Sequence, residues 1–377
     1  MFVERLALED FRNYGREEVH FADGLNVVVG ANAQGKTNLL EAIYCLGGLG
    51  SLRSSESEVV RHGAERALIH AVLTRKGRQI RIDMEMKQTK GTRVLINRTP
   101  ASGPRALREL ATGVFFGPDD LTLVKGSPDT RRRFLDDLVV KLHPAREPVR
   151  REWERVLRQR NALLKTIPRS GSARSDAMST LEVWDDAMSR AGAQLTAARI
   201  AVLEQLQPVV DARYRGIAGM GRIELSYASA WLSTQEVKPD VTHLRDVLEA
   251  QIAESRNREI DRGMSLVGPQ RDDIAISIEK DGDSLDARAY ASQGDQRTIA
   301  LALKLAERDL LADALGETPI LLFDDVFSEL DPARREWLAK EVKGLGQTIV
   351  SSAGDADDVP GGHDRLLEVS AGKVTSK

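Results

Sequence analysis

The sequence predicts an α/β protein in which a mixed sheet with helices, β-rich in its N-terminal part, is interrupted by an inserted helical region. Two observations support this. Short β-branched and apolar runs typical of strands occur near both ends of the 377-residue chain. In the middle, long charged segments have the period of helices instead. We therefore expect one domain built from residues 1–128 and 262–377, and an inserted, mainly helical domain at 129–261.

The first domain begins with segments typical of strands. Apolar residues alternate with polar ones from Val3 to Phe11, and the run LNVVV ends just before Gly30. The alternation predicts a half-buried strand, and the short apolar run predicts a buried one. The segment KTNLLEAIYCL that follows has helical spacing, and residues 66–97 have the pattern of antiparallel strands.

Strand character returns after the helical middle. The segment DIAISIEKDGDSLDARAY predicts two strands around an Asp-Gly turn at Asp281 and Gly282. A helix is predicted from Gln293 to Ala314, because its apolar residues form one stripe. The segments PILLFDD, DPARREWLAKEV and GQTIVSSA then predict a buried strand, a helix and a second buried strand.

Composition and the N-terminus exclude several classes of protein. A net charge of −3 argues against a uniformly basic nucleic-acid coat but leaves local basic patches possible. The single cysteine, Cys45, lies in an apolar helical segment, so neither disulfides nor a cysteine metal site is expected. The first residues are acidic where a signal peptide would be apolar, and no run reaches the ~18 apolar residues of a membrane span. We expect a cytoplasmic protein without a membrane segment.

The segment GANAQGKTN fits the phosphate-loop pattern G-x-x-x-x-G-K-[ST] and lies between a predicted strand and a predicted helix. In such a loop the backbone N–H groups surround the phosphates, Lys36 reaches the β and γ oxygens, and Thr37 holds Mg²⁺. A chance glycine loop is the alternative, but the strand and helix on either side make it less plausible. The predicted nucleotide-binding residues are Gly30, Ala31, Asn32, Ala33, Gln34, Gly35, Lys36, Thr37 and Asn38.

Two adjacent carboxylates end the predicted strand PILLFDD. Asp324 is the expected Mg²⁺ partner in a phosphate-loop enzyme, and Asp325 could orient or deprotonate the attacking water. Taken alone, two aspartates after an apolar strand more often end the strand than form a catalytic pair. The phosphate loop reverses that preference, and we expect catalysis to depend on Asp325 and Lys36. Neighbouring residues of a strand point to opposite faces, so the two carboxylates should have separate roles.

A serine and a glycine open the helix that precedes this strand. Ser292 and Gly294 lie in the segment ASQGDQRTIALALK, and could offer a hydroxyl and free backbone N–H groups to a phosphate. Serine is also a favoured helix cap, and an isolated motif of this kind is more often only a cap. The position of this segment just before PILLFDD, with SELD after it, favours a functional role.

This order of motifs resembles the ABC-type ATPase heads of the SMC and Rad50 group. The segments PDDLTLVKGSPDTRRRFLD, GPQRDD, LEDFRNY and FDDVFSELD are in addition similar to signature stretches of the RecF family of recombination and repair proteins. The likeness extends over essentially the whole chain. It implies an ABC-type head that binds ATP with Mg²⁺, in which the inserted region replaces the long coiled coil of SMC proteins.

The resemblance also implies an ATP-dependent homodimer. In the SMC and Rad50 group the signature serine of one subunit completes the nucleotide site of the other. Ser292, Gln293 and Gly294 would then meet the γ-phosphate held by the partner chain, and Asp331 would lie at the dimer seam. Our hypothesis is that the closed dimer holds DNA as a clamp and that hydrolysis releases the DNA.

Three departures from the wider ABC pattern concern the rate of hydrolysis more than ATP binding. Asp325 stands where most of these ATPases have glutamate, and its shorter side chain predicts slow turnover. Ser351 and Ser352 end the strand at which transporters have a switch histidine. The loop GPDDL has no glutamine, and Asp119 or Asp120 is the candidate replacement.

The arginine-rich stretch 131–160 is the candidate DNA-binding surface. Forked guanidinium donors suit phosphate contacts, and such contacts weaken with salt. A solvated helix face is the alternative for its second half, where glutamates could pair with the arginines. Aromatic residues are only 5% of the chain, so duplex contact is favoured over base stacking on single strands. The predicted DNA-binding residues are Arg131, Arg132, Arg133, Arg150 and Arg151.

By resemblance, the partners are DNA at junctions of single and double strands, and mediators of the RecR and RecO type that help to load recombinase. Two other functions compete with this hypothesis. A transporter ATPase subunit would have a shorter spacing between phosphate loop and signature, a switch histidine and a glutamine loop. A structural head that binds ATP with little turnover remains open because of Asp325.

Overall fold

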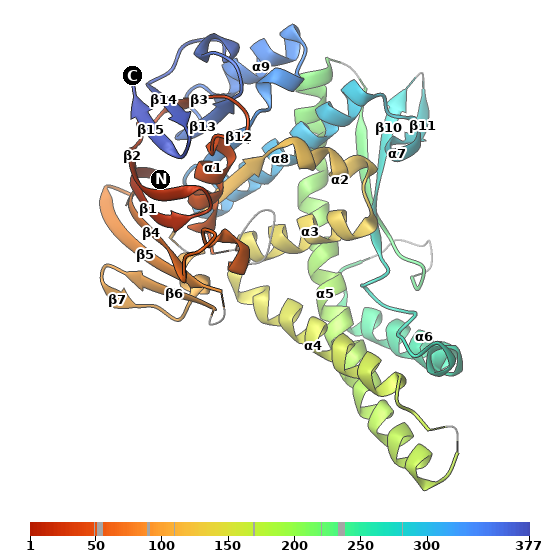
Figure 1. Cartoon of the computed structure of the whole chain (residues 1–377). Coiled ribbons are helices and arrows are strands. Elements are labelled where there is room, and N and C mark those ends of the chain that lie inside the picture. The colour runs from red at the N-terminus through yellow and green to blue at the C-terminus, as the bar shows by residue number, and fades with distance from the viewer. Residues whose placement is uncertain are drawn as a thin grey trace. The chain divides into compact units, whose positions relative to one another are not determined.

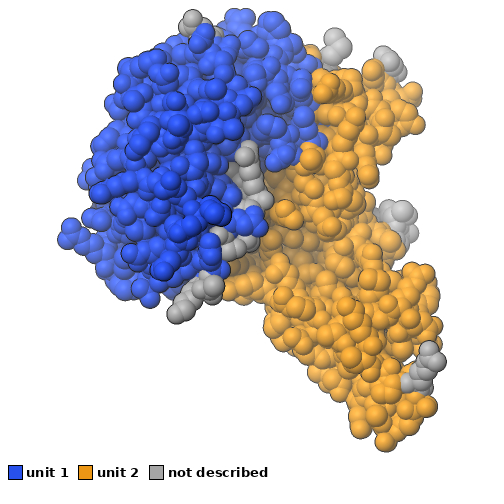
Figure 2. All heavy atoms as spheres, viewed as in Figure 1, with its two compact units in different colours: residues 1–121, 297–377 blue, residues 122–296 orange. Residues whose placement is uncertain are grey.

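The computed structural model describes residues 1–48, 50, 56–88, 91–108, 110–168, 170–219, 221–232, 238–280 and 282–377. The chain divides into two compact units (Figure 2). The first unit consists of residues 1–121 and 297–377, and the second of residues 122–296. The predicted boundaries at 128 and 262 fall inside the second unit, which therefore holds strands as well as helices.

One sheet of the first unit is antiparallel and comes entirely from the N-terminal third of the chain. Its strands are paired in the order β2-β1-β4-β5-β6-β7. Their bounds are Tyr14–His20 (β2), Phe2–Phe11 (β1), Arg66–Arg75 (β4), Arg78–Lys87 (β5), Gly91–Ile96 (β6) and Thr99–Pro100 (β7). Strand β5 pairs in antiparallel orientation with both β4 and β6, which confirms the antiparallel strands predicted for residues 66–97.

The other sheet of the first unit combines strands from both ends of the chain (Figure 1). Its order is β15-β14-β3-β13-β12-β8, and all pairs are parallel except β14 with β15. The bounds are Lys373–Ser376 (β15), Arg365–Ser370 (β14), Leu25–Val29 (β3), Thr348–Ser352 (β13), Ile320–Asp324 (β12) and Gly113–Phe116 (β8). The predicted mixed sheet is thereby confirmed.

Burial explains why the central strands are continuous apolar runs. Every residue of β12 and β13 is buried, as expected for parallel strands covered on both faces. Helices α1 (Lys36–Cys45) and α9 (Pro332–Val342) follow β3 and β12, and α8 (Gln293–Leu315) precedes β12. The carboxyl ends of β3, β12 and β13 lie at one edge of the sheet, because these strands are parallel neighbours.

The second unit is formed by helices and a small antiparallel sheet. Its helices are α2 (Thr122–Lys125), α3 (Pro128–Leu142), α4 (Glu147–Leu164), α5 (Ser172–Ala218), α6 (Val241–Arg262) and α7 (Ala287–Tyr290). The sheet has the order β11-β10-β9, with bounds Asp283–Asp286, Asp273–Lys280 and Ile223–Ala228. The strands predicted around the Asp-Gly turn correspond to β10 and β11, while Asp281 itself lies outside the described residues.

Short 3₁₀ turns complete the chain at Glu56–Val59, Pro104–Leu107, Pro118–Leu121, Pro144–Arg146, Phe327–Glu329 and Ala356–Asp358. Helix α5 is the longest described helix, with 47 residues, and contains both charged and apolar side chains. Among the described residues, no helix combines the length and the apolar character that crossing a bilayer requires.

Candidate nucleotide site

The segment from Gly30 to Asn38 comprises the loop between β3 and α1, residues 30–35, and the first residues of α1, as the motif predicts. Gly30 has φ 151°, and a Cβ there would lie 2.2 Å from the carbonyl oxygen of Val369. Gly35 has φ 122°, and a Cβ there would lie 2.6 Å from Nδ2 of Asn13. Both positions need glycine because the backbone is in a region that other residues avoid and because no space exists for a side chain. At these two positions the cradle is therefore formed by backbone alone.

Lys36 is held inside this cradle at the start of α1. Its Nζ donates to the carbonyl oxygens of Gly30, at 2.6 Å, and Ala31, at 2.9 Å, and the residue is only 6% exposed. Burial lowers the pKa of the Lys36 amine, while the charges of Asp325 and Asp324 act in the opposite direction. The Lys36 amine thus donates to backbone carbonyl oxygens, and the oxygens of a bound anion would replace these as its acceptors.

Thr37 and Asp324 meet across the carboxyl edge of the sheet. The Thr37 hydroxyl donates to the Asp324 carboxylate and lies 2.8 Å from each of its oxygens. A hydroxyl and a carboxylate are the hard oxygen ligands that Mg²⁺ prefers, so these two residues fit the predicted metal site. The structure brings together the two halves of the site that the sequence places far apart.

Asp325 has different partners from Asp324. Its backbone has φ 55°, which is uncommon for a residue other than glycine, and turns the chain sharply after β12. Its Oδ1 accepts from the Ser328 hydroxyl at 3.0 Å and from the Ala353 backbone N–H at 3.3 Å. The two carboxylates therefore point to separate surroundings, as the sequence predicts.

Asn13 and Tyr14, two residues not predicted as part of the site, support the phosphate loop together with the side chain of Gln34. Asn13 donates from Nδ2 to the Gln34 carbonyl oxygen and accepts from Asn38, both at 2.8 Å. The buried Tyr14 hydroxyl donates to the Gly35 carbonyl oxygen at 2.9 Å. The Gln34 side chain accepts from the backbone N–H of Ala371 at 2.6 Å. The sequence signal for Asn13 and Tyr14 is the segment LEDFRNY, which contains both residues and is one of the points of resemblance.

The GPDDL loop follows β8 and lies beside the same edge. A Cβ on Gly117 would be 3.6 Å from the Cβ of Asp324. Asp120 accepts from the Gly117 backbone N–H at 2.8 Å, and burial raises the pKa of its carboxyl group. Asp120 thus helps to shape the loop in which a glutamine was expected.

Ser292, Gln293 and Gly294 belong to the second unit, at the start of α8. Ser292 is exposed and forms a capping box with Asp295. Its hydroxyl donates to the Asp295 carboxylate at 2.7 Å and accepts from the Asp295 backbone N–H at 3.2 Å. The cap that the sequence analysis left as an alternative is therefore present, and contact with a partner's phosphate stays a proposal.

Asp331 also has a local role. It caps α9, because its carboxylate accepts from the Arg334 backbone N–H at 3.0 Å and from the Arg334 guanidinium at 2.7 Å. The backbone N–H is the main reason why the pKa of Asp331 is lowered. Asp331 is exposed, so this cap leaves it accessible for the dimer seam that the resemblance implies.

Arg131 and Arg132 have structural surroundings that correct their predicted role. The Arg131 side chain is buried and forms a two-bond ion pair with Asp273, each bond 2.7 Å long. It also donates to carbonyl oxygens of Leu123, Val124 and Gly126. Arg132 donates to the Asp272 carbonyl oxygen and pairs with Asp129. Guanidinium groups engaged in this way are not available to DNA, so the prediction of DNA contact is wrong for Arg131 and Arg132.

The other predicted arginines differ in their accessibility. Arg133 is exposed. Arg150 pairs with Asp137 at 2.6 Å and with Glu154 at 3.2 Å. Arg151 has a side chain 60% exposed and lies 3.6 Å from Glu147. The glutamate pairing that the sequence suggested for this helix is thus observed, and Arg133 and Arg151 are the best placed for an outside partner.

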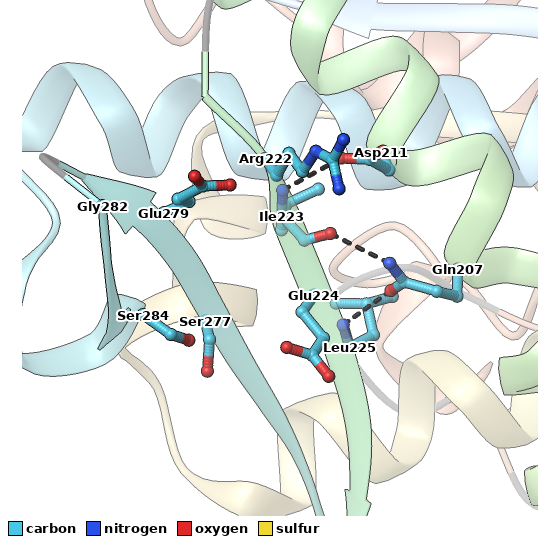
Figure 3. A pocket seen from close by; sticks show the side chains of 10 residues that line it. All are labelled: Gln207, Asp211, Arg222, Ile223, Glu224, Leu225, Ser277, Glu279, Gly282 and Ser284. Carbon is cyan, nitrogen blue, oxygen red and sulfur yellow. Dashed lines mark hydrogen bonds between the residues drawn. The ribbon is translucent and has the colours of Figure 1, made fainter.

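A concave region of about 470 Å³ lies elsewhere in the second unit, on the small sheet (Figure 3). Gln207 from α5 donates to the Ile223 carbonyl oxygen and accepts from the Leu225 N–H, as the next strand of a sheet would do. Asp211 accepts from the Ile223 N–H at 3.1 Å. These side chains protect the open edge of β9 from pairing with another strand. The region contains none of the predicted site residues.

Comparison with known proteins agrees with this geometry. The family model described as RecF/RecN/SMC N terminal domain matches residues 2–369. A DNA replication and repair protein RecF of Streptomyces avermitilis is 45% identical over 369 residues, which are 96% of this chain and 95% of that protein. A protein of the same name from Beutenbergia cavernae is 43% identical over 386 residues, covering 96% and 95% of the two chains.

Solved structures extend the likeness to the fold. The recombination mediator protein RecF bound to ATP, described as part of the RecFOR pathway, superposes with a TM-score of 0.90 at 28% identity, over 100% of this chain and 97% of that one. The Smc head domain of Pyrococcus furiosus superposes with a TM-score of 0.56 at 18% identity, over 100% and 96% of the chains, and supports the fold alone. The chain therefore belongs to the RecF family, and its fold is that of the ABC-type ATPase heads of RecF and SMC proteins.

Proposed function

We propose that this chain is a DNA repair protein that binds and slowly hydrolyses ATP with Mg²⁺, and that ATP closes two copies of it into a clamp on DNA. The observation that carries the proposal is the contact between Thr37 and Asp324, 2.8 Å long, beside a glycine cradle that holds Lys36. The RecF relative whose structure contains ATP supports the choice of nucleotide.

In this proposal each group of the site has one task. The backbone N–H groups of Gly30–Asn38 and the Lys36 amine bind the phosphates, and their positive potential favours the triphosphate. Thr37 and Asp324 would hold Mg²⁺, which supplies charge neutralisation on the phosphate oxygens when it is bound. Asp325 orients the attacking water and accepts its proton.

Slow turnover is proposed because Asp325 is short and already held in place. Its Oδ1 accepts two hydrogen bonds, from Ser328 and from the Ala353 N–H, and these restrict the reach of the carboxylate toward a water molecule. The same observation favours a second candidate function, a head that binds ATP with little turnover. Phosphate release by the wild type and Asp325→Asn in the presence of DNA distinguishes the two functions.

The dimer is proposed from the exposed start of α8. Ser292 and Gln293 are both exposed, and the serine hydroxyl would exchange its Asp295 partner for a γ-phosphate held on the second copy. Inverting a 1:99 population of open and closed states takes about 5.5 kcal/mol of differential binding, which two shared nucleotides could supply. Asp331 would lie near the seam.

Sedimentation with and without ATP tests this proposal directly. The wild type is expected to be a monomer without nucleotide and a dimer with Mg-ATP. Lys36→Arg disturbs the cradle, and Ser292→Arg places a long side chain where the partner's phosphate would lie. If both variants dimerise as well as the wild type, the ATP-gated clamp is disproved.

DNA binding is proposed to use the exposed arginines Arg133 and Arg151, with duplex next to a single-stranded gap as the preferred substrate and mediators of the RecR and RecO type as partners. The pathway named for the solved relative supports these partners. Affinity for duplex, single-stranded and gapped DNA should be measured over a salt series with ATP present. Phosphate contacts predict a linear fall of log affinity with log salt, and equal affinity for all three substrates would contradict the preference for gaps.

A further inference from the structure

Ser351 touches both of the adjacent carboxylate residues of the site. It lies on β13 directly opposite Asp324 on β12, in the parallel register of the two strands, and is fully buried. Its hydroxyl is 2.7 Å from Oδ1 of Asp324 and 3.0 Å from the backbone nitrogen of Asp325. A single side chain thus contacts the residue assigned to Mg²⁺ and the residue assigned to the attacking water.

The direction of these hydrogen bonds follows from their chemistry. The backbone N–H of Asp325 can only donate, so the Ser351 oxygen accepts from it. The single hydroxyl hydrogen is then free to be donated to the Asp324 carboxylate, which accepts when ionised. Because each bond uses a different part of the hydroxyl, both can be present at once.

The Asp325 backbone needs such support. Its φ of 55° is unfavourable for a residue with a side chain, and such conformations persist where the surrounding structure holds them. The Asp325 N–H is within reach of the Ser351 carbonyl oxygen, at 3.2 Å, as well as of the Ser351 hydroxyl. Without the Ser351 hydroxyl, the Asp325 N–H would keep the Ser351 carbonyl oxygen as its acceptor. The Asp324 carboxylate would lose a hydrogen-bond donor.

The next residue has no such role. Ser352 hydrogen-bonds instead with Asp358, at 3.0 Å, and with the Gly354 N–H, at 3.2 Å. Adjacent strand residues point to opposite faces, which explains why only one of the two serines reaches the aspartates.

We propose that Ser351 is a positioning residue that fixes the Asp324 carboxylate for Mg²⁺ and the Asp325 turn for the attacking water. It acts through these two residues and does not itself touch nucleotide. The inference rests on the proposed function, since it assigns to Ser351 a part in Mg-ATP binding and hydrolysis.

The experiment compares Ser351→Ala, Ser351→Thr and a matched control, Thr348→Val. Thr348 is buried on the same strand, and its hydroxyl has no hydrogen-bond partner among the described residues, so the control removes a hydroxyl of the same strand at no cost to the site. Each purified chain is titrated with Mg²⁺ at saturating ATP, and both the Mg²⁺ midpoint and the maximal rate of phosphate release are recorded.

We expect Ser351→Ala to raise the Mg²⁺ midpoint and lower the maximal rate, each by about tenfold, the lower end of what loss of a supporting hydrogen bond at a metal site costs. Ser351→Thr retains the hydroxyl and should restore the midpoint, while Thr348→Val should resemble the wild type. Thermal melting checks folding. If the threonine variant does not fold, Ser351→Cys, a weak donor of similar size, should behave like the alanine variant.

Two failures are distinguishable. If the wild type neither binds Mg-ATP nor releases phosphate, the proposed function fails. If the wild type is active and Ser351→Ala keeps the wild-type Mg²⁺ midpoint and rate, the inference about Ser351 is wrong while the function stands. The inference is also wrong if Ser351→Ala and Thr348→Val both lose maximal rate and both keep the wild-type Mg²⁺ midpoint. That result would indicate only a general effect of substitutions on this strand.

Discussion

The hydroxyl of Thr37 lies 2.8 Å from each carboxylate oxygen of Asp324, although 287 residues separate them in the chain. The contact forms because β3, which precedes the phosphate loop, and β12, which ends at Asp324, both pair with β13 in parallel. Parallel strands place their carboxyl ends at one edge, where binding sites of α/β sheets usually form. The residues of the second unit separate β8 from β12 in the sequence, but the two strands still pair in one sheet.

Replacement of Thr37 by alanine should weaken Mg²⁺-dependent ATP binding by about tenfold to hundredfold, because one oxygen ligand and the donor to Asp324 are lost. Replacement by serine keeps the hydroxyl and should retain most of the affinity. Titration of each variant with nucleotide, with Mg²⁺ and with chelator, measures the effect. Equal affinity of the alanine and serine variants in Mg²⁺ would show that the hydroxyl is not a ligand.

Local features of the fold were predictable from the sequence, and its long-range pairing was not. The strand, loop and helix around Lys36 follow from a β-branched run, two glycines and helical spacing, all within about 20 residues. That β3 pairs with β13 and β14 depends on contacts over more than 300 residues, and only the resemblance to ABC-type heads suggested them. The second unit extends past the predicted insert to residue 296, because β10 pairs with β9, a non-local contact, and β11 with β10.

In the candidate site, too, some features were predictable from the sequence and others were not. Lys36, Thr37 and Asp324 were identified from motifs whose spacing reflects their chemistry. Arg131 and Arg133 are two positions apart in one basic run, yet the first is buried against Asp273 and the second is exposed. Burial depends on what packs against each helix face, and a run of like residues does not reveal it.

The two arginines give a paired prediction. Arg131→Ala leaves the Asp273 carboxylate and three backbone carbonyl groups without their partner, and should lower the free energy of unfolding by about 3 kcal/mol. Arg133→Ala should change it by less than about 0.5 kcal/mol. Urea unfolding of both variants tests this difference, which vanishes if Arg131 is no more than a surface residue.

Arg133→Ala should instead affect DNA. If its guanidinium contacts one phosphate, the slope of log affinity against log salt should become shallower by about 0.9, with the same loss for every duplex sequence. Arg155→Ala is the matched control, because Arg155 already pairs with Glu152 at 2.7 Å on the same group of helices. An unchanged slope for Arg133→Ala would remove this residue from the DNA surface.

Tyr14→Phe should loosen the phosphate loop without disturbing the core. The phenol ring is fully buried, and only its hydrogen bond to the Gly35 carbonyl oxygen, 2.9 Å long, is lost. A buried hydrogen bond of this kind contributes about 1 kcal/mol, which corresponds to roughly fivefold weaker ATP binding if the loop alone absorbs the loss. Calorimetric titration with ATP measures it, and wild-type affinity would mean that the loop holds its shape without Tyr14.

The protonation of Lys36 leads to a prediction about pH. Burial lowers the pKa of its amine below the ordinary 10.5 in the free protein, whereas bound phosphates stabilise the charged amine and raise that pKa. Between the two pKa values the complex holds more protons than the free protein, so ATP binding takes up protons there and its affinity falls as pH rises. Titrations at several pH values below 10.5, each in two buffers of different ionisation enthalpy, measure this uptake. Lys36→Arg should show no proton uptake on ATP binding, whatever affinity for ATP it retains, because a guanidinium stays charged in this pH range. Proton release by the wild type on binding would contradict the assignment of Lys36 to the phosphates.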